Sequence, residues 1–249
     1  EAAVTLDVTS VNKVMVIATF NCKNDGSSIG SFRTADNADN NINSGTIQRS
    51  LNTHFGVGSV VHIFDVSAYT GNRTYVFQHA TTAGSSTTAV QLTAIALSDG
   101  TKHLANQAVS IASSVALPSS WASVVESDVV ISPGIGGFYV AASIQSGKDS
   151  GNENTVGEWV IQYKKTTTGT WTDLSYTINR STSGTGKGII NLVGALPDNT
   201  VAGDYYFRVA HQRSSGTDPV ETQFCNLVAV SLSRNAANEF LPVSVSSKP

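Results

Sequence analysis

Charged side chains and cysteines are scarce in this chain. Asp, Glu, Lys and Arg make up 13% of its 249 residues, and the formal net charge is −3. A typical globular domain has about a quarter charged residues. The mildly acidic balance comes without a basic stripe, which argues against a nucleic-acid partner. The only two cysteines, Cys22 and Cys225, lie in different halves, so neither half has the internal disulfide of an antibody domain.

Helical patterns and long apolar runs are also missing. No segment keeps a 3.6-residue apolar periodicity, and strong helix formers are few, so we expect few helices. No apolar run is long enough to cross a membrane, which argues against membrane insertion. The chain starts at Glu1 without a basic leader, the pattern of a processed or trimmed product. Its Thr, Ser and Asn content is typical of extracellular or cell-surface proteins.

The sequence has none of the common catalytic motifs. Patterns of the G-x-S-x-G, H-E-x-x-H, Walker and dinucleotide-binding types are absent, and the five histidines are scattered. No pair of acidic residues is placed alike in both halves, as a glycosidase site repeated with the fold would need. We therefore expect no enzymatic activity and no cofactor.

What the sequence does contain is one unit that occurs twice. Residues 71–98 and 203–233 both run from a glycine through an aromatic strand to a histidine, a Ser/Thr/Gly-rich loop and an apolar strand. Other segments match in the same order along the chain: Val14–Phe20 with Phe138–Ile144, Ile47–Ser50 with Ile178–Ser181, Gly56–Val61 with Gly186–Asn191, and Val109–Ser114 with Val243–Ser247. Matching order over the whole chain predicts internal duplication, with domains at 1–117 and 118–249.

Short apolar runs separated by polar clusters recur about every 8–12 residues, which predicts an all-β fold. About eight strands in each copy favour two tandem jelly-roll β-sandwiches over immunoglobulin-type domains. The strands are expected near 3–9, 13–21, 29–33, 45–51, 58–66, 72–79, 88–98 and 107–113, and near 124–131, 137–145, 157–164, 172–180, 187–193, 203–211, 222–233 and 241–246.

The long strands near 14–20, 90–98 and 225–233 are apolar on both faces. A sheet with one wet face should alternate apolar and polar residues, so we expect both faces of these strands to be covered. One face would pack into the sandwich, and the other would contact another domain or subunit. The residues expected at this interface are Val14, Val16, Ala18, Leu92, Ala94, Ala96, Leu227, Ala229 and Ser231.

The paired Gly–aromatic and closing apolar strands resemble the jelly rolls of the tumour-necrosis-factor and complement globular-head superfamily. The resemblance lies in Gly71–His79, Leu92–Ser98, Gly203–His211 and Leu227–Ser233. In that family the first and last long strands are neighbours in the inner sheet, which is the oligomer interface. The resemblance therefore implies association of this chain with itself. A generic double jelly roll, as in viral capsid and bacterial surface proteins, is equally compatible.

Four further sites are candidates. His79 and His211 end equivalent strands, and without a repeated chemical partner they are expected to be part of the fold. Asp36, Asp39 and Asn41 lie in an Asx-rich segment that either binds Ca²⁺ or forms a surface turn. Trp159 and Trp171 either pack in the core or present a platform for surface glycans. Cys22 and Cys225 are either an interdomain disulfide or two free thiols.

Two functions follow from these features. The first is a non-enzymatic extracellular structural or adhesive subunit. It would assemble with copies of itself, as a closed oligomer or a filament, through the apolar sheet faces and through exchange of the end segments 1–12 and 234–249. The alternative is a carbohydrate-binding module that uses loops of the second domain.

Overall fold

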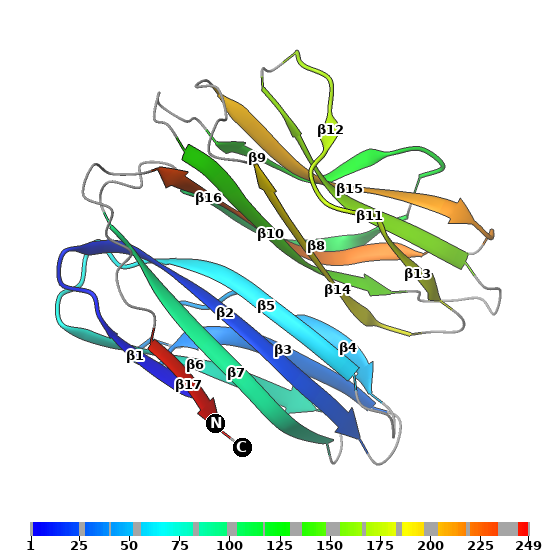
Figure 1. Ribbon diagram of the computed structural model, residues 1–249. Coiled ribbons are helices and arrows are strands. Elements are labelled where there is room, and N and C mark those ends of the chain that lie inside the picture. The colour runs from blue at the N-terminus through cyan, green and yellow to red at the C-terminus, as the bar shows by residue number, and fades with distance from the viewer. Residues whose placement is uncertain are drawn as a thin grey trace. The chain divides into compact units, whose positions relative to one another are not determined.

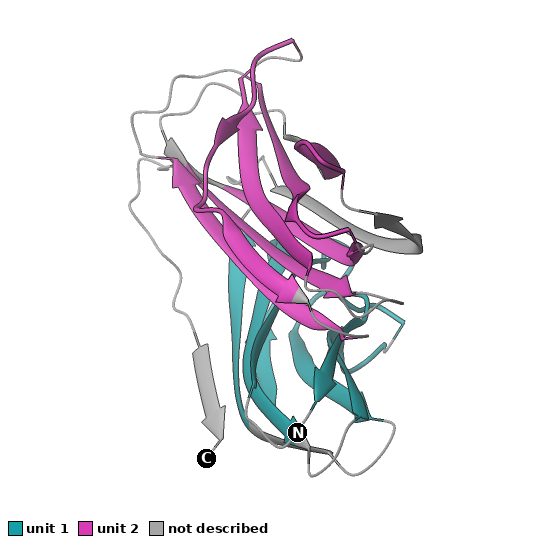
Figure 2. Ribbon diagram, turned by 90° about the vertical axis from the view of Figure 1, so that its right-hand side faces the viewer, with its two compact units in different colours: residues 1–99, 239–249 teal, residues 100–238 magenta. Residues whose placement is uncertain are grey.

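The structure is a computed structural model that divides into two compact units. It describes residues 2–24, 28–39, 41–51, 56–81, 85–98, 104–116, 118–129, 136–147, 155–165, 168–182, 186–196, 204–217, 220–233 and 244–248. Unit 1 comprises residues 1–99 and 239–249, and unit 2 comprises residues 100–238 (Figure 2). All the regular elements of the described residues are strands, so none of them is a helix that could span a membrane.

Unit 1 is a sandwich of two four-stranded antiparallel sheets (Figure 1). One sheet has the order β1, β6, β3, β4, with bounds Ala3–Asp7, Asn72–Thr81, Ser28–Asp36 and Ile47–Leu51. The other has the order β17, β7, β2, β5, with bounds Ser244–Lys248, Ser85–Ser98, Val11–Asn24 and Gly56–Asp65. Alternate residues of each strand point inward. The buried rings of Phe20, Phe32 and Phe77 meet between the sheets, with 4.4 Å between the first two centroids.

Unit 2 is built in the same way. One sheet has the order β9, β15, β11, β12, with bounds Ala122–Val129, Tyr205–Ser215, Thr155–Lys164 and Thr172–Asp173, and β13 (Ile178–Thr182) also pairs with β11. The other has the order β8, β16, β10, β14, with bounds Leu104–Ala116, Glu221–Ser233, Gly136–Gly147 and Gly188–Leu196. Its core includes Phe138, Trp159, Phe207 and Leu227, all at most 1% exposed.

The two units share one strand order. In unit 2, β9, β15, β11 and β13 stand where β1, β6, β3 and β4 stand in unit 1, and β8, β16, β10 and β14 stand where β17, β7, β2 and β5 stand. The all-β fold with jelly-roll-type sandwiches is therefore confirmed. The sequence segments expected to match lie on strands of equivalent place, but their origin by duplication stays a prediction.

The units differ from the predicted domains in two segments. Strand β8 lies within the predicted first domain, yet it pairs with β16 of unit 2, from Leu104 opposite Val230 to Ala116 opposite Glu221. Strand β17 lies within the predicted second domain, yet it pairs with β7 of unit 1. Apolar periodicity identifies a segment as a strand, but it does not specify the edge that the strand joins. The last strand of each predicted domain thus completes a sheet of the other.

Candidate functional site

The residues expected at an interface lie mostly in the two cores. Val14, Val16, Ala18, Leu92, Ala94, Leu227 and Ala229 are all 0% exposed. Ala96 is partly exposed, and the side chain of Ser231 lies outside the described residues. On the opposite faces, Met15 of β2 is 6% and Val228 of β16 is 0% exposed, whereas Ile17 and Ile95 are partly exposed and Thr19 is exposed. Both faces are therefore covered on β16 but not on β2 and β7, and the inward side chains expected at the interface are not available to bind a second molecule.

The two matching histidines have different surroundings. His211 is buried, and its Nδ1 lies 2.9 Å from the hydroxyl oxygen of Thr222. The indole N–H of Trp159 donates to the same oxygen over 2.9 Å. An indole only donates, so the Thr222 hydroxyl is free to donate its own hydrogen to an unprotonated Nδ1. Burial lowers the pKa of His211 to about 4, which matches a neutral ring held in the fold. His79 is exposed.

This network decides the role of Trp159. Its ring is 0% exposed, so it is a core residue and cannot stack on a sugar. The prediction of a glycan platform therefore fails for Trp159 and is left to Trp171, which is half-buried.

The Asx-rich segment is a set of turns. One carboxylate oxygen of Asp36 accepts from the backbone N–H of Ala38, and the other accepts from the Arg73 guanidinium at 2.5 Å. Asp39 accepts from the backbone N–H of Asn41, which is exposed. Across the residues that the structure describes, no group of three His, Cys, Asp or Glu side chains is placed to hold a metal ion. The carboxylates of Asp36 and Asp39 thus serve the turns and an ion pair.

Of the two alternatives for Cys22 and Cys225, the structure has both thiols free and buried. Each packs inside its own unit. The Cys22 thiol donates to the carbonyl of Gly56 in the neighbouring strand β5 over 3.4 Å. Cys225 is a fully buried member of the unit 2 core, and this burial raises the pKa of its thiol well above the usual range.

A surface of aromatic and polar side chains surrounds Trp171 on the outer side of the β12–β11–β15–β9 sheet. We call it the Trp171 face, and it consists of Gln162, Lys164, Trp171, Asp173, Tyr206 and Arg208. Lys164 Nζ lies 4.4 Å and the Arg208 guanidinium carbon 4.3 Å from the Trp171 ring centroid. Such contacts between cations and an indole ring hold all three groups in place.

Hydrogen bonds join the polar members of this face. Arg208 donates through Nε to Gln162 over 2.8 Å and through a terminal nitrogen to Ser123 over 2.9 Å. The Gln162 amide in turn donates to Asp173 over 2.8 Å. Tyr206 lies beside Lys164, whose Nζ is 5.5 Å from the phenol ring centroid. The face therefore offers an ordered ring edge, planar donors and a carboxylate acceptor, the groups that bind hydroxyl-rich ligands.

Sequence reasoning reached only one member of the Trp171 face. The signal for the others was the two-residue spacing of Gln162 with Lys164 on β11 and of Tyr206 with Arg208 on β15. Residues at that spacing share one face of a strand. Their position opposite one another comes from the register, which pairs Gln162 with Arg208 and Lys164 with Tyr206. Register is not visible in the sequence.

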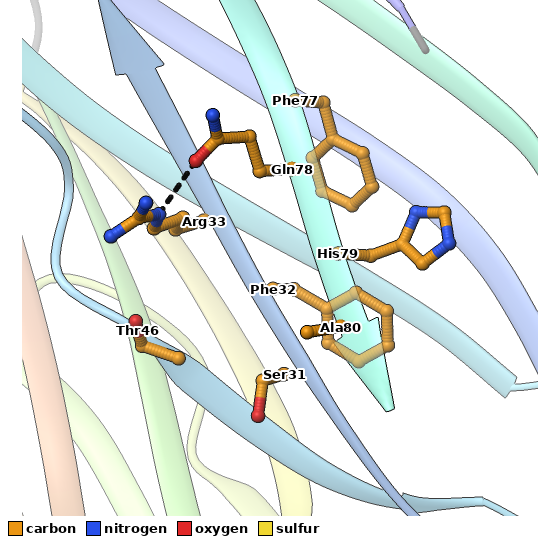
Figure 3. A pocket seen from close by; sticks show the side chains of 8 residues that line it. All are labelled: Ser31, Phe32, Arg33, Thr46, Phe77, Gln78, His79 and Ala80. Atoms are coloured by element: carbon orange, nitrogen blue, oxygen red, sulfur yellow. Dashed lines mark hydrogen bonds between the residues drawn. The ribbon is translucent and has the colours of Figure 1, made fainter. Parts of the chain in front are cut away.

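Unit 1 has a hollow of about 500 Å³ beside β3 and β6 (Figure 3). Its lining residues are Ser31, Phe32, Arg33, Thr46, Phe77, Gln78, His79 and Ala80. Arg33 Nε donates to the Gln78 side-chain oxygen over 2.7 Å. None of these lining residues is acidic, so the hollow presents donors and apolar walls without the carboxylate that an acid–base pair with His79 would need.

No known protein family matches the sequence, and no curated protein matches it. Among solved structures, PNGase F, a glycosylasparaginase from Flavobacterium meningosepticum, is 12% identical with a TM-score of 0.40, covering 98% of this chain and 92% of that one. The structure of infectious bursal disease virus, Gx strain, is 10% identical with a TM-score of 0.32, covering 99% of this chain and 74% of that one. The Eiger TNF of S. frugiperda is 15% identical with a TM-score of 0.27, covering 56% of this chain and 96% of that one. Likenesses at this level assign neither a family nor a function to this chain.

Proposed function

We propose that this protein is a non-enzymatic, extracellular structural or adhesive subunit that assembles with copies of itself. One observation carries the proposal: the last strand of each predicted domain, β8 or β17, completes a sheet of the other. Backbone pairing along a sheet edge tolerates many sequences. The same pairing made between two chains would link them without any exposed apolar patch.

The route of assembly differs from that expected of the apolar sheet faces. A closed oligomer of the tumour-necrosis-factor type would use side chains such as Val16 and Leu92, and both are 0% exposed in the single chain. Pairing at strand edges needs no such face. Contacts of that kind that do not close on themselves produce filaments, so we favour an open assembly over a closed one.

The first test is the mass of the protein in solution. We expect the weight-average mass from multi-angle light scattering to rise above that of one chain, 26.0 kDa, between about 10 µM and about 1 mM, because strand pairing within one chain has an effective concentration near mM. Images by electron microscopy at the upper concentration should show linear particles. A single-chain mass throughout this range would contradict the proposal.

The Trp171 face favours a second function, binding of a surface glycan. Trp171 is half-buried and held between Lys164 and Arg208, and the hydrogen-bonded amide of Gln162 and carboxylate of Asp173 lie on the same face. The ring edge that the two cations leave open would contact a sugar, whose hydroxyls would bond to such planar groups. This function is compatible with the first, since it uses a sheet face and not a sheet edge.

A glycan array tests this second function. We expect Trp171→Ala to weaken the binding of any glycan about fivefold, because one aromatic contact contributes on the order of 1 kcal/mol beyond the area it buries. Tyr176→Ala is the matched control, since Tyr176 is a 93% exposed aromatic residue outside the Trp171 face. Equal binding by the two variants, or no glycan bound by the unmodified protein, would remove this function.

A further inference from the structure

The two units fill the same place in their sheets from different parts of the chain. In unit 2 the edge strand beside β16 is β8, which comes just before β9 in the sequence. In unit 1 the edge strand beside β7 is β17, the last of the described strands (Figure 1). Its antiparallel register runs from Ser244 opposite Ala94 to Lys248 opposite Val90. Unit 1 is therefore completed by a strand at the far end of the sequence.

The chain follows one rule twice. After β7, the last long strand of unit 1, the chain continues into β8, which joins unit 2. After β16, the last long strand of unit 2, the chain continues into β17, which joins unit 1 and not unit 2. The segment after each long closing strand thus serves as an edge strand of a different jelly roll. Continued beyond one molecule, this rule gives β17 a place in unit 1 of the next copy.

The pairing of β17 is the smaller of the two. It consists of five residue pairs, Ser244 to Lys248, whereas β8 forms nine pairs with β16. Short edge pairings open locally at a low free-energy cost compared with global unfolding. When β17 leaves, the backbone groups of β7 on that side lose their partners, and such an edge accepts another strand. Of the two strands, β17 therefore exchanges more readily than β8.

The tether to β17 is long enough for it to leave. Strand β16 ends at Ser233 and β17 begins at Ser244, so residues 234–243 lie between them. Extended, a segment of that length spans about 35 Å. Between β7 and β8 only residues 99–103 intervene. A tether of ten residues favours internal pairing in dilute solution, with an effective concentration on the order of mM. Pairing between chains is therefore driven by concentration.

We infer that β17 is a donor strand, which pairs with β7 of a second copy in the register that it adopts within one chain. This inference rests on the self-assembly proposed above and identifies the surface that carries it. Each copy then has one donor, β17, and one acceptor, the edge of β7. A contact between two different surfaces repeats head to tail and leaves one of each free at the ends of the assembly. Within one dilute chain, β17 covers its own acceptor edge.

Paired cysteines test this inference directly. Gln91 is exposed and lies opposite Ser247 in the register. Opposite residues of antiparallel strands have Cα atoms about 4.5–5.5 Å apart, within the range that a disulfide spans. We would mix equal amounts of the full-length single variants Gln91→Cys and Ser247→Cys at about 1 mM, a concentration comparable with that of the tether. After mild oxidation, a non-reducing gel resolves the products. The native Cys22 and Cys225 are buried.

A disulfide-linked dimer in this mixture is the expected result, since each chain carries only one of the two introduced thiols. The double variant Gln91→Cys/Ser247→Cys should give a ladder of covalent oligomers at about 1 mM and an internally linked single chain at about 10 µM. The control mixture pairs Ser247→Cys with Thr70→Cys, which is exposed in unit 1 but not on β7. A third mixture adds Ser246→Pro to the Ser247→Cys chain, because proline removes a backbone N–H from the strand, and the dimer should then be lost.

The outcomes separate the inference from the proposal on which it rests. A dimer yield no greater than that of the Thr70 control overturns donation by β17. If light scattering still shows assembly in that case, self-association stands and uses another surface. If neither dimer nor assembly forms up to about 1 mM, both fail. Persistence of the dimer with Ser246→Pro would also overturn the inference, because cross-linking would then not depend on strand pairing.

Discussion

Replacing Trp159 with alanine should lower the free energy of unfolding of unit 2 by about 3–5 kcal/mol, the usual cost of removing a fully buried tryptophan. The side chain is 0% exposed and is the largest of the fully buried residues. Its loss opens a cavity and also leaves the Thr222 hydroxyl, at 2.9 Å from the indole nitrogen, without its donor. Urea denaturation followed by far-UV circular dichroism measures the effect.

Two further variants separate the contribution of the hydrogen bond from that of the buried volume and compare Trp159 with a tryptophan at the surface. Trp159→Phe keeps most of the volume but loses the hydrogen bond, so we expect it to cost about 1–3 kcal/mol. Trp171→Ala is the control at a half-buried tryptophan, whose contacts with Lys164 and Arg208 are at the surface. It should cost only about 1 kcal/mol. Equal losses for Trp159→Ala and Trp171→Ala would show that Trp159 is not the core residue described above.

These variants also assign the two tryptophans to different properties. If Trp171→Ala changes glycan binding without much loss of stability, and Trp159→Phe changes stability without loss of binding, the Trp171 face is the binding surface. The sequence presented both residues as one candidate, either core residues or a platform for glycans. Burial separates them: strand β11 turns Trp159 inward against His211, whereas Trp171 lies beyond that strand, just before β12.

Much of the fold was readable from local pattern. The matched segments Ile47–Ser50 and Ile178–Ser181 became the equivalent strands β4 and β13. Each carries an arginine, Arg49 or Arg180, whose guanidinium fills the space where a Cβ at Gly56 or Gly188 would lie. A glycine there allows the arginine to lie flat across the next strand. These matches could be predicted because turn glycines, strand length and apolar alternation are encoded within a few residues.

The partners of the end strands were not readable in this way. Strand β8 has a nearer candidate in β7, five residues before it, yet it pairs with β16. Which edge a strand joins depends on contacts between residues far apart in sequence, and no local signal reports them. The interface prediction failed for a related reason. Apolar residues on both faces of β2, β7 and β16 do not show which face packs into the sandwich, and the residues named for the interface are the inward ones.

The second large effect is expected at the buried ion pair of unit 1. Asp36→Asn should cost about 3 kcal/mol or more, because it leaves the charge of Arg73 without its partner. The Asp36 side chain is 2% and that of Arg73 13% exposed, and the oxygen and nitrogen are 2.5 Å apart. The guanidinium also lies 3.7 Å from the Tyr69 ring centroid, so it is held in place and cannot turn to water without losing that contact.

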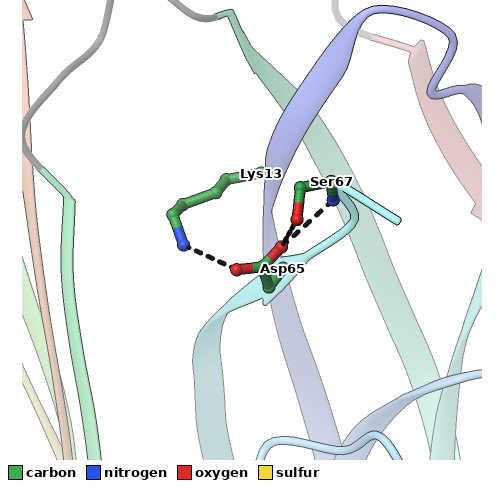
Figure 4. A network of polar contacts seen from close by, with 3 residues as sticks. All are labelled: Lys13, Asp65 and Ser67. Carbon is green, nitrogen blue, oxygen red and sulfur yellow. Dashed lines mark hydrogen bonds and ion pairs between the residues drawn. The ribbon is translucent and has the colours of Figure 1, made fainter. Parts of the chain in front are cut away.

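The same unit provides a matched ion pair at the surface. Asp65 lies 3.1 Å from Lys13, with side chains 62% and 35% exposed, and it accepts two hydrogen bonds from Ser67 (Figure 4). Those bonds are the main reason that the pKa of Asp65 is lowered, ahead of the attraction of Lys13. Asp65→Asn should therefore cost at most about 1 kcal/mol.

Thermal and urea unfolding of the two variants, each with and without added Ca²⁺, separates the ion pair from a metal site at Asp36. We expect the loss from Asp36→Asn to exceed that from Asp65→Asn and to be the same with and without the cation, because both oxygens of Asp36 are already engaged by Ala38 and Arg73. Calcium-dependent stabilisation of the unmodified protein that disappears in Asp36→Asn would mean that Asp36 exchanges Arg73 for a metal ion. Arg73→Met then distinguishes the two accounts. With an ion pair alone it should destabilise unit 1, because it leaves the Asp36 carboxylate buried without its cation, whereas with a metal site added Ca²⁺ should restore the loss.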